Sequence, residues 1–272
     1  MKNYYDVDTK ISNIEEAYLK SQVQVVNSQH EGLIERTPLT LYSRQTTGTN
    51  YFLNSIKNVF SGFNIPCIVT EFDPETLPLK TTIELVNNTV GGYVYCRTNE
   101  TKDELDLISQ FVKRQGDIDG MSYDVLDNHF APSVVRATMT ILAHFFEDLN
   151  LNGKTILLVN RSRYVGMPLH YILTSCGATV LQANSTTPQD IIADFTDIAD
   201  IQIWATGVKG IADLYVEKGE LVIDVSQVDT TQGSDITNVT NVCKVTGKLT
   251  CLSLVQNYLS ALPKEPLTQQ QN

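Results

Sequence analysis

The strongest chemical signal in this chain is a pair of side chains, Arg161 and Ser162, that closely follows the apolar run TILLV. A guanidinium and a hydroxyl are donors that can hold a phosphate through charge-assisted hydrogen bonds. Gly166 then permits close backbone approach, and Pro168 suits the first turn of a helix. A helix that begins there would aim its free N–H groups at an anion. The segment therefore predicts a phosphate-binding turn.

The surrounding stretch, residues 153–187, has the order strand, turn, helix, strand, by which α/β proteins build a dinucleotide site. The turn lacks the GxGxxG fingerprint. The second strand ends at Ala183, Asn184 and Ser185, where NAD-specific proteins place an acidic residue on the ribose. Because there is no acidic residue at that position and Arg161 can bind a 2′-phosphate, the sequence favours NADP over NAD. The alternative is an ordinary strand-to-helix turn with solvent-facing arginines.

The elements that must position these residues alternate between helix and strand, which favours a parallel sheet. In the first half we expect helices at 11–31, 48–63, 76–87 and 103–113, and strands at 37–42, 66–71 and 92–96. The first helix has Ile14, Ala17, Tyr18, Val25 and Val26 for its apolar face.

A second alternating series follows a long helix that Pro132 opens and that runs to about residue 149. Its predicted strands are 155–159, 178–182, 201–205 and 221–225, and its helices begin near Val165, Thr187 and Gly210. A last amphipathic helix spans 249–262. The fold class is therefore α/β with two domains, a Rossmann-like NADP-binding domain plus an α/β N-terminal catalytic domain.

Composition excludes several classes of protein. The 272 residues carry a formal charge of −11, a surface that repels nucleic acid. No apolar run reaches the roughly 18 residues of a membrane span, and no signal peptide opens the chain. The 5 cysteines are scattered without a CxxC pair, which argues against a metal site and for a reduced, cytoplasmic setting.

The turn and the strand after it resemble the methylenetetrahydrofolate dehydrogenase/methenyltetrahydrofolate cyclohydrolase family. That family carries Gly-Arg-Ser-x-x-Val-Gly-x-Pro, then an Ala-Thr-Val strand that ends at Ser-x-Thr. This chain has NRSRYVGMP at 160–168, ATV at 178–180 and STT at 185–187. Weaker matches are GDIDG at 116–120, ATG at 205–207, VID at 222–224 and GKLT at 247–250.

The resemblance implies oxidation of a methylene bridge on tetrahydrofolate by hydride transfer to NADP, followed by hydrolysis of the methenyl product. It implies a folate-type catalytic domain at 1–131, completed by helix 248–262, a Rossmann-like domain at 132–247, a cleft between them as the site, and a homodimer. The catalytic positions fall on Tyr51, Ser55, Cys96 and Asp119. The cofactor positions fall on Asn160, Arg161, Ser162, Val165, Gly166, Ser185, Thr206, Gly207 and Gln227.

Several positions depart from the family pattern. Ser55 stands where the family has a lysine four residues after its tyrosine, and Cys96 stands where it has a glutamine. Lys57 lies about 200° around the helix from Ser55 and would point away. The family's Pro-Cys-Thr-Pro is PSVV at 132–135, and its glycine-rich loop is replaced at 241–247. Because serine cannot act as a proton donor near neutral pH, we expect reduced or lost cyclohydrolase activity.

Three readings of function remain open at this point. The first is an NADP-dependent dehydrogenase with weak or no cyclohydrolase activity. The second is a catalytically inactive nucleotide- or folate-binding homologue with a regulatory or partner role. The third is a dehydrogenase for a different substrate, which would use the remodelled pocket. For Asp119 the alternative to binding the pterin is a structural role, because an Asp-Gly pair often closes a turn.

Overall fold

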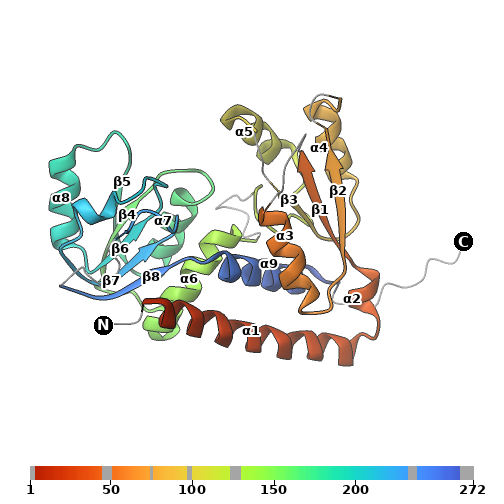
Figure 1. Cartoon of the computed structure of the whole chain (residues 1–272), viewed down its shortest axis with the longest axis horizontal. Coiled ribbons are helices and arrows are strands. Elements are labelled where there is room, and N and C mark those ends of the chain that lie inside the picture. Colours follow the sequence, from red (N-terminus) through yellow and green to blue (C-terminus); the bar gives the residue numbers. More distant parts are fainter. Residues whose placement is uncertain are drawn as a thin grey trace, which may run out of the picture. The chain divides into compact units, whose positions relative to one another are not determined.

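A computed structural model describes residues 4–44, 51–73, 76–96, 100–122, 130–231 and 238–263 (Figure 1). The chain forms two compact units. One combines residues 1–14 with 134–250, and the other combines residues 15–133 with 251–272. Among the described helices, none is both long and apolar enough to cross a lipid bilayer.

The helices and strands of the first half alternate as the sequence predicts. They are α1 (Tyr4–Gln29), α2 (Leu33–Arg36), β1 (Leu39–Arg44), α3 (Tyr51–Ser61), β2 (Cys67–Phe72), α4 (Leu79–Asn87), β3 (Tyr93–Cys96) and α5 (Lys102–Phe111). The strands form a parallel sheet of order β2-β1-β3, in which Leu41 of β1 is paired with Val69 and Val94. Thr101 and Glu104 begin α5 with a reciprocal capping box.

The second half contains the four predicted strands and a fifth that was not predicted. It consists of α6 (Ser133–Phe145), η1 (Glu147–Leu149), β4 (Thr155–Val159), α7 (Gly166–Ser175), β5 (Thr179–Ala183), α8 (Gln189–Ile198), β6 (Ile201–Trp204), η2 (Ala212–Leu214), β7 (Lys218–Asp224), β8 (Asn238–Lys244) and α9 (Gly247–Ala261). Its strands form a parallel sheet of order β5-β4-β6-β7-β8. The chain leaves β4 toward β5 and then returns to the other side of β4 at β6, so the strand order reverses there. Ligands of such sheets bind at this reversal, outside the carboxyl ends of the strands.

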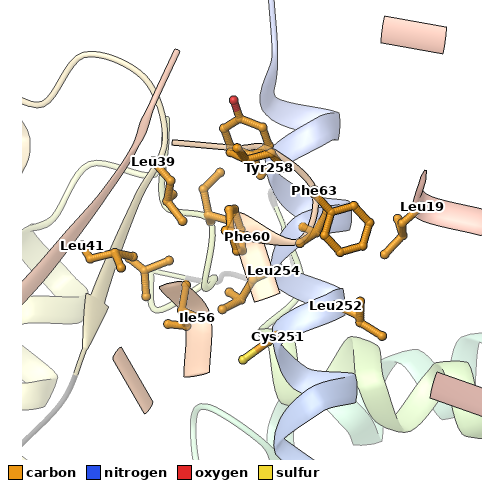
Figure 2. Packing of buried hydrophobic residues seen from close by; sticks show 14 of the residues in the cluster. Leu19, Leu39, Leu41, Ile56, Phe60, Phe63, Cys251, Leu252, Leu254 and Tyr258 are labelled. Carbon is orange, nitrogen blue, oxygen red and sulfur yellow. The ribbon is translucent and has the colours of Figure 1, made fainter. Parts of the chain in front are cut away.

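The final helix supplies part of the core of the unit that holds the three-stranded sheet. Figure 2 shows the cluster, with side chains from α9 lying beside those of β1 and α3. Its members include Leu39, Leu41, Ile56, Phe60, Cys251, Leu252, Leu254 and Tyr258. Each large apolar side chain buried in this way stabilises the fold by about 1.5–3 kcal/mol. The predicted helix at 249–262 is therefore a core element of this unit.

Some sequence expectations about the elements are wrong. The apolar face assigned to α1 is largely exposed, with Ile14 at 52% and Tyr18 at 51%, whereas Leu19 and Val23 are buried. Apolar residues occur on several sides of this helix, so periodicity alone did not decide which side packs. The helix expected to begin near Gly210 is only the short 3-10 turn η2, because β7 begins soon after it.

A further correction concerns the segment that replaces the family's glycine-rich loop. Residues 241–244 belong to β8, which pairs in parallel with β7 from Lys218↔Asn238 to Asp224↔Lys244. Val239 and Cys243 of this strand are buried, so it contributes apolar side chains to the interior. The glycine-poor sequence is thus in part the sequence of an edge strand.

Candidate functional site

Asn160, the first residue after β4, organises the predicted phosphate-binding turn. Its side-chain Oδ1 accepts hydrogen bonds from the backbone N–H of Ser162 at 2.7 Å and of Gly166 at 3.0 Å. Its Nδ2 donates to the carbonyl of Ala205, just after β6, at 2.6 Å. The carbonyl of Asn160 accepts a hydrogen bond from Gln182 Nε2 of β5 at 2.9 Å. One asparagine therefore ties together the ends of three adjacent strands and the start of α7.

Gly166 opens α7 in close contact with this asparagine. A Cβ at position 166 would lie 2.4 Å from the carbonyl oxygen of Asn160 and 2.7 Å from Cα of Arg161. The sequence interpretation, in which this glycine lets the backbone approach a ligand, therefore needs correction. The close approach is between the start of α7 and the chain's own turn.

The loop after β5 is shaped by its own side chains. Asn184 Oδ1 accepts hydrogen bonds from the N–H and the hydroxyl of Thr186, at 2.9 and 2.7 Å. Thr187 Oγ1 accepts the N–H of Asn184 at 3.0 Å. Such local side-chain-to-backbone bonds are typical of asparagine and threonine in turns. They present the exposed Ser185 at the tip of the loop.

The loop after β6 is held by a buried carboxylate, Asp229. Its oxygens accept the N–H and the hydroxyl of Thr206 at 2.8 and 2.6 Å, and the N–H of Val208 at 3.0 Å. Asp229 is fully buried. The Gly207 N–H donates to Ser226 Oγ at 3.0 Å. This loop is therefore rigidly placed beside the turn at Asn160.

A cavity of about 540 Å³ opens where these three loops meet. Its lining is Val159, Asn160, Arg161, Ser162, Asn184, Ser185, Thr186, Thr187, Gln189, Ile192, Trp204, Thr206, Val208, Ile211 and Tyr215. The volume is in the range of pockets that hold small molecules. The half-buried Tyr215 stacks on the fully buried Trp204 with ring centroids 5.9 Å apart and gives the cavity an aromatic wall. Its rim is made of hydroxyls, amides and the exposed Arg161.

The charge on the described lining of the cavity is positive. Arg161 is a cation, and the lining residues that the structure describes include no aspartate or glutamate. An apolar wall with a hydroxyl-rich rim and a guanidinium suits a purine nucleoside that carries a phosphate on its ribose.

The predicted cofactor residues divide into two groups. Asn160, Arg161, Ser162, Ser185 and Thr206 line the cavity. Val165, Gly166, Gly207 and Gln227 are not in its described lining. The last of these has a φ of 66°, and its carbonyl accepts a hydrogen bond from Lys244 Nζ at 2.9 Å.

Sequence reasoning missed the residues that hold these loops in place. The Asn-Ser-Thr-Thr run at 184–187 is a recognisable turn signal and could have identified Asn184. Asp229 lies 23 residues beyond Thr206 and carried no local signal. Trp204 of the apolar strand β6 is fully buried in the core and backs the cavity from the inside.

The residues predicted for catalysis lie in the other unit. Tyr51 begins α3 and is 82% exposed, and Ser55 is exposed one turn later. The Ser55 hydroxyl donates to the carbonyl of Tyr51 at 2.9 Å. The charge of Lys57 on α3 partly offsets the burial that raises the pKa of the Cys67 thiol in β2 to about 11. Lys57 and Ser55 are both exposed on α3.

Cys96 and Asp119 are both buried in that unit. Cys96 is fully buried at the end of β3 and belongs to the apolar cluster. This position supports a packing role for the side chain. Asp119 Oδ1 accepts a hydrogen bond from Ser133 Oγ at 2.5 Å. Burial and the nearby Asp119 carboxylate raise the pKa of the Cys251 thiol to about 12.

Asp117 is a second buried acid in the same segment. Its Oδ2 accepts the N–H and the hydroxyl of Ser122, each at 2.6 Å. Burial raises its pKa to about 6, although the bonds from Ser122 oppose the shift. Its Oδ1 is buried and makes no hydrogen bond within the described residues. Those residues also hold no cluster of three or more histidine, cysteine or acidic side chains arranged to bind a metal.

Comparisons with known proteins agree with this geometry. Residues 132–265 match the profile of the tetrahydrofolate dehydrogenase/cyclohydrolase, NAD(P)-binding domain. The bifunctional protein FolD of Leuconostoc citreum is 33% identical over 113 residues, which cover 40% of this chain and 38% of that protein. The chain thus spans well under half the length of this curated relative in the match.

Two solved structures share the fold along nearly the whole chain. The bifunctional enzyme FolD from Campylobacter jejuni has a TM-score of 0.78 at 21% identity and covers 94% of this chain and 97% of its own. The Trypanosoma brucei dehydrogenase-cyclohydrolase, complexed with NADP and an inhibitor, has a TM-score of 0.75 at 18% identity and covers 94% and 95%. At these identities the likeness shows the fold.

Proposed function

We propose, from the premise that this chain belongs through residues 132–265 to the tetrahydrofolate dehydrogenase/cyclohydrolase family, that it binds NADP and oxidises methylenetetrahydrofolate. The observation that carries the proposal is the cavity at the carboxyl ends of β4, β5 and β6. It combines an aromatic wall with Arg161 and a rim of hydroxyls, and its described lining has no carboxylate. A carboxylate there would favour the free ribose hydroxyls of NAD.

The residues of the cavity have separate tasks in this proposal. Arg161 and Ser162 would hold the 2′-phosphate, and Ser185 would add a hydroxyl from the facing loop. Tyr215 and Ile192 would cover the purine. When bound, NADP supplies the acceptor for a hydride, which is the cofactor's own chemistry. The protein's part is to orient and to exclude water.

We assign the folate side to residues 1–131 completed by helix 248–262, and the dinucleotide side to residues 132–247, with residues 1–14 packed in the unit of the dinucleotide side. Tyr51 offers an exposed ring on which a pterin could stack, and Asp119 offers a carboxylate for its amino group. Ser55 replaces the family's lysine and provides no proton donor near neutral pH. We therefore propose that cyclohydrolase activity is strongly reduced, by about 10²–10⁴ as for the loss of a general acid–base group.

A second function is favoured by one specific contact. The Asp119 carboxylate already accepts a hydrogen bond from Ser133, so part of its acceptor capacity is used within the protein. Together with Ser55 and the buried Cys96, this supports a homologue that binds nucleotide but does not turn over folate.

The test begins with titrations of the purified protein with NADP and NAD, followed by Arg161→Ala. We expect the variant to weaken NADP by about tenfold to a hundredfold and NAD little, because a charge-assisted bond is lost. Arg163→Ala is the matched control, since Arg163 is exposed but does not line the cavity. Equal weakening of both nucleotides would remove the 2′-phosphate assignment.

Turnover separates the two functions. NADPH formation from methylenetetrahydrofolate, followed by absorbance, would support the dehydrogenase. Tight NADP binding without turnover would support the binding protein. A normal rate of methenyltetrahydrofolate hydrolysis would contradict the predicted loss of cyclohydrolase activity.

A further inference from the structure

The first turn of α7 has no backbone donor left for a ligand. Its N–H groups would ordinarily be free and would form an anion site. Here the Gly166 N–H donates to Asn160 Oδ1, and the Met167 N–H donates to the carbonyl of Ser162 at 2.9 Å. The Val165 N–H donates to Ser162 Oγ at 3.2 Å, and Pro168 has no N–H.

We infer that Asn160 places its own carboxamide oxygen where α7 would otherwise hold the pyrophosphate of a dinucleotide. The same oxygen also accepts a hydrogen bond from the Ser162 N–H, and the Asn160 Nδ2 donates to the carbonyl of Ala205. Hydrogen bonds therefore hold the Asn160 side chain at its oxygen and at its nitrogen, and both would have to break before it could rotate away from α7. The inference rests on the proposed NADP binding and adds how the ligand is recognised.

The consequence is an unequal division of binding between the two ends of the ligand. The cavity keeps Arg161, Ser185 and the aromatic wall for an adenosine that carries a 2′-phosphate. The start of α7 offers the pyrophosphate no N–H. The recognised chemical class is thus a 2′-phosphorylated adenosine, and Asn160 is the positioning residue that sets this preference.

Gly166 makes the arrangement tight. Its α-carbon is packed so closely on the turn that an added Cβ would fall 2.4 Å from the Asn160 carbonyl oxygen. Gln182 binds that same carbonyl at 2.9 Å and also reaches the carbonyl of Gly166 at 3.4 Å. Release of the Gly166 N–H would require these contacts to rearrange together.

The experiment compares adenosine 2′-monophosphate with NADP by calorimetric titration of the full chain. We expect the two dissociation constants to agree within about tenfold, because the pyrophosphate gains no bonds from α7. In Asn160→Gly the Ser162 and Gly166 N–H groups become available. NADP should then gain about tenfold over adenosine 2′-monophosphate, as for one hydrogen bond to a charged group.

Two variants control for a general disturbance of the cavity. Asn160→Asp keeps an acceptor oxygen for both N–H groups and adds a negative charge, so NADP should gain nothing over adenosine 2′-monophosphate in this variant. Asn184→Gly disturbs the opposite loop, and it should weaken both ligands without changing that ratio. An NADP preference above about a hundredfold in the wild type, unchanged in Asn160→Gly, would overturn the inference and leave NADP binding intact.

A measurement on the wild type covers the case in which Asn160→Gly does not fold. The amide resonances of Ser162 and Gly166 should move equally with NADP and with adenosine 2′-monophosphate. A shift specific to NADP would contradict the inference. If neither ligand binds, the proposed function fails and the inference fails with it.

Discussion

The hydroxyl of Ser133 donates a hydrogen bond to Asp119 Oδ1 at 2.5 Å, and both side chains are buried. The Ser133 N–H also donates to the carbonyl of Asp119 at 3.3 Å. Ser133 begins α6, so this helix starts on the acidic segment at 116–120. The contact joins a carboxylate that the resemblance assigns to folate with a residue that departs from the family pattern.

Ser133→Ala should lower the free energy of unfolding by about 1–3 kcal/mol, because the buried Asp119 loses a donor. Urea unfolding measures this change. Ser260→Ala is the control, since that exposed hydroxyl only donates to Gln256 within α9, and it should change stability by less than about 0.5 kcal/mol. Equal effects of the two substitutions would show that the Asp119 contact contributes nothing.

Asp117→Asn should change how stability depends on pH. Burial raises the pKa of Asp117 from 3.8 to about 6, so the folded protein holds this proton more tightly than the unfolded chain. The contribution to stability is fully present below 3.8 and is lost as pH rises through 6. Relative to the wild type, the variant should therefore gain up to about 3 kcal/mol between pH 4 and pH 7.

The comparison for Asp117 is unfolding by urea at a series of pH values. Asp148→Asn serves as the control, because Asp148 is exposed and its φ of 53° suits asparagine. Asp8, whose pKa burial also raises to about 6, contributes to the same pH range in both proteins and cancels in the difference. A pH profile of Asp117→Asn parallel to that of the wild type would refute the assignment.

Gly166→Ala should be strongly destabilising. The new Cβ would lie 2.4 Å from a backbone oxygen that Gln182 also holds, and overpacking of this kind costs about 1–3 kcal/mol or more. Thermal unfolding measures the change. At Gly247, the first residue of α9, an added Cβ meets nothing within 4 Å, so Gly247→Ala should leave the melting temperature nearly unchanged. A neutral Gly166→Ala would mean that the turn at Asn160 is looser than described.

Asp229→Ala should weaken NADP binding although Asp229 does not line the cavity. It removes the acceptor for Thr206 and Val208, which do line the cavity, and a loss of about 1–2 kcal/mol corresponds to about tenfold in affinity. The control is Asp213→Ala, which frees Thr231 in a segment outside the cavity lining. Unchanged NADP affinity in Asp229→Ala would show that the loop holds its shape without the carboxylate.

Much of the fold could be predicted from the sequence because its signals are local. The strand at 155–159 was predicted with the bounds it has, since a short apolar run between turn residues indicates a buried parallel strand. The turn NRSRYVGMP was recognisable because its residue types and spacing are close together in the chain. Arg161, Ser162 and Ser185 were predicted from such signals and Thr206 from the family resemblance, and all four line one cavity.

What only the tertiary structure decided depends on partners distant in the chain. Whether the Gly166 N–H is free depends on the rotamer of Asn160, and that rotamer is set by Ala205, 45 residues away. The order β5-β4-β6 brings three loops to one cavity, and Asp229 then fixes one of them. Local sequence specifies which residues can bind an anion. The packing of the sheet determines which of their donors remain for a ligand, because each donor is satisfied by whichever acceptor the fold places nearest.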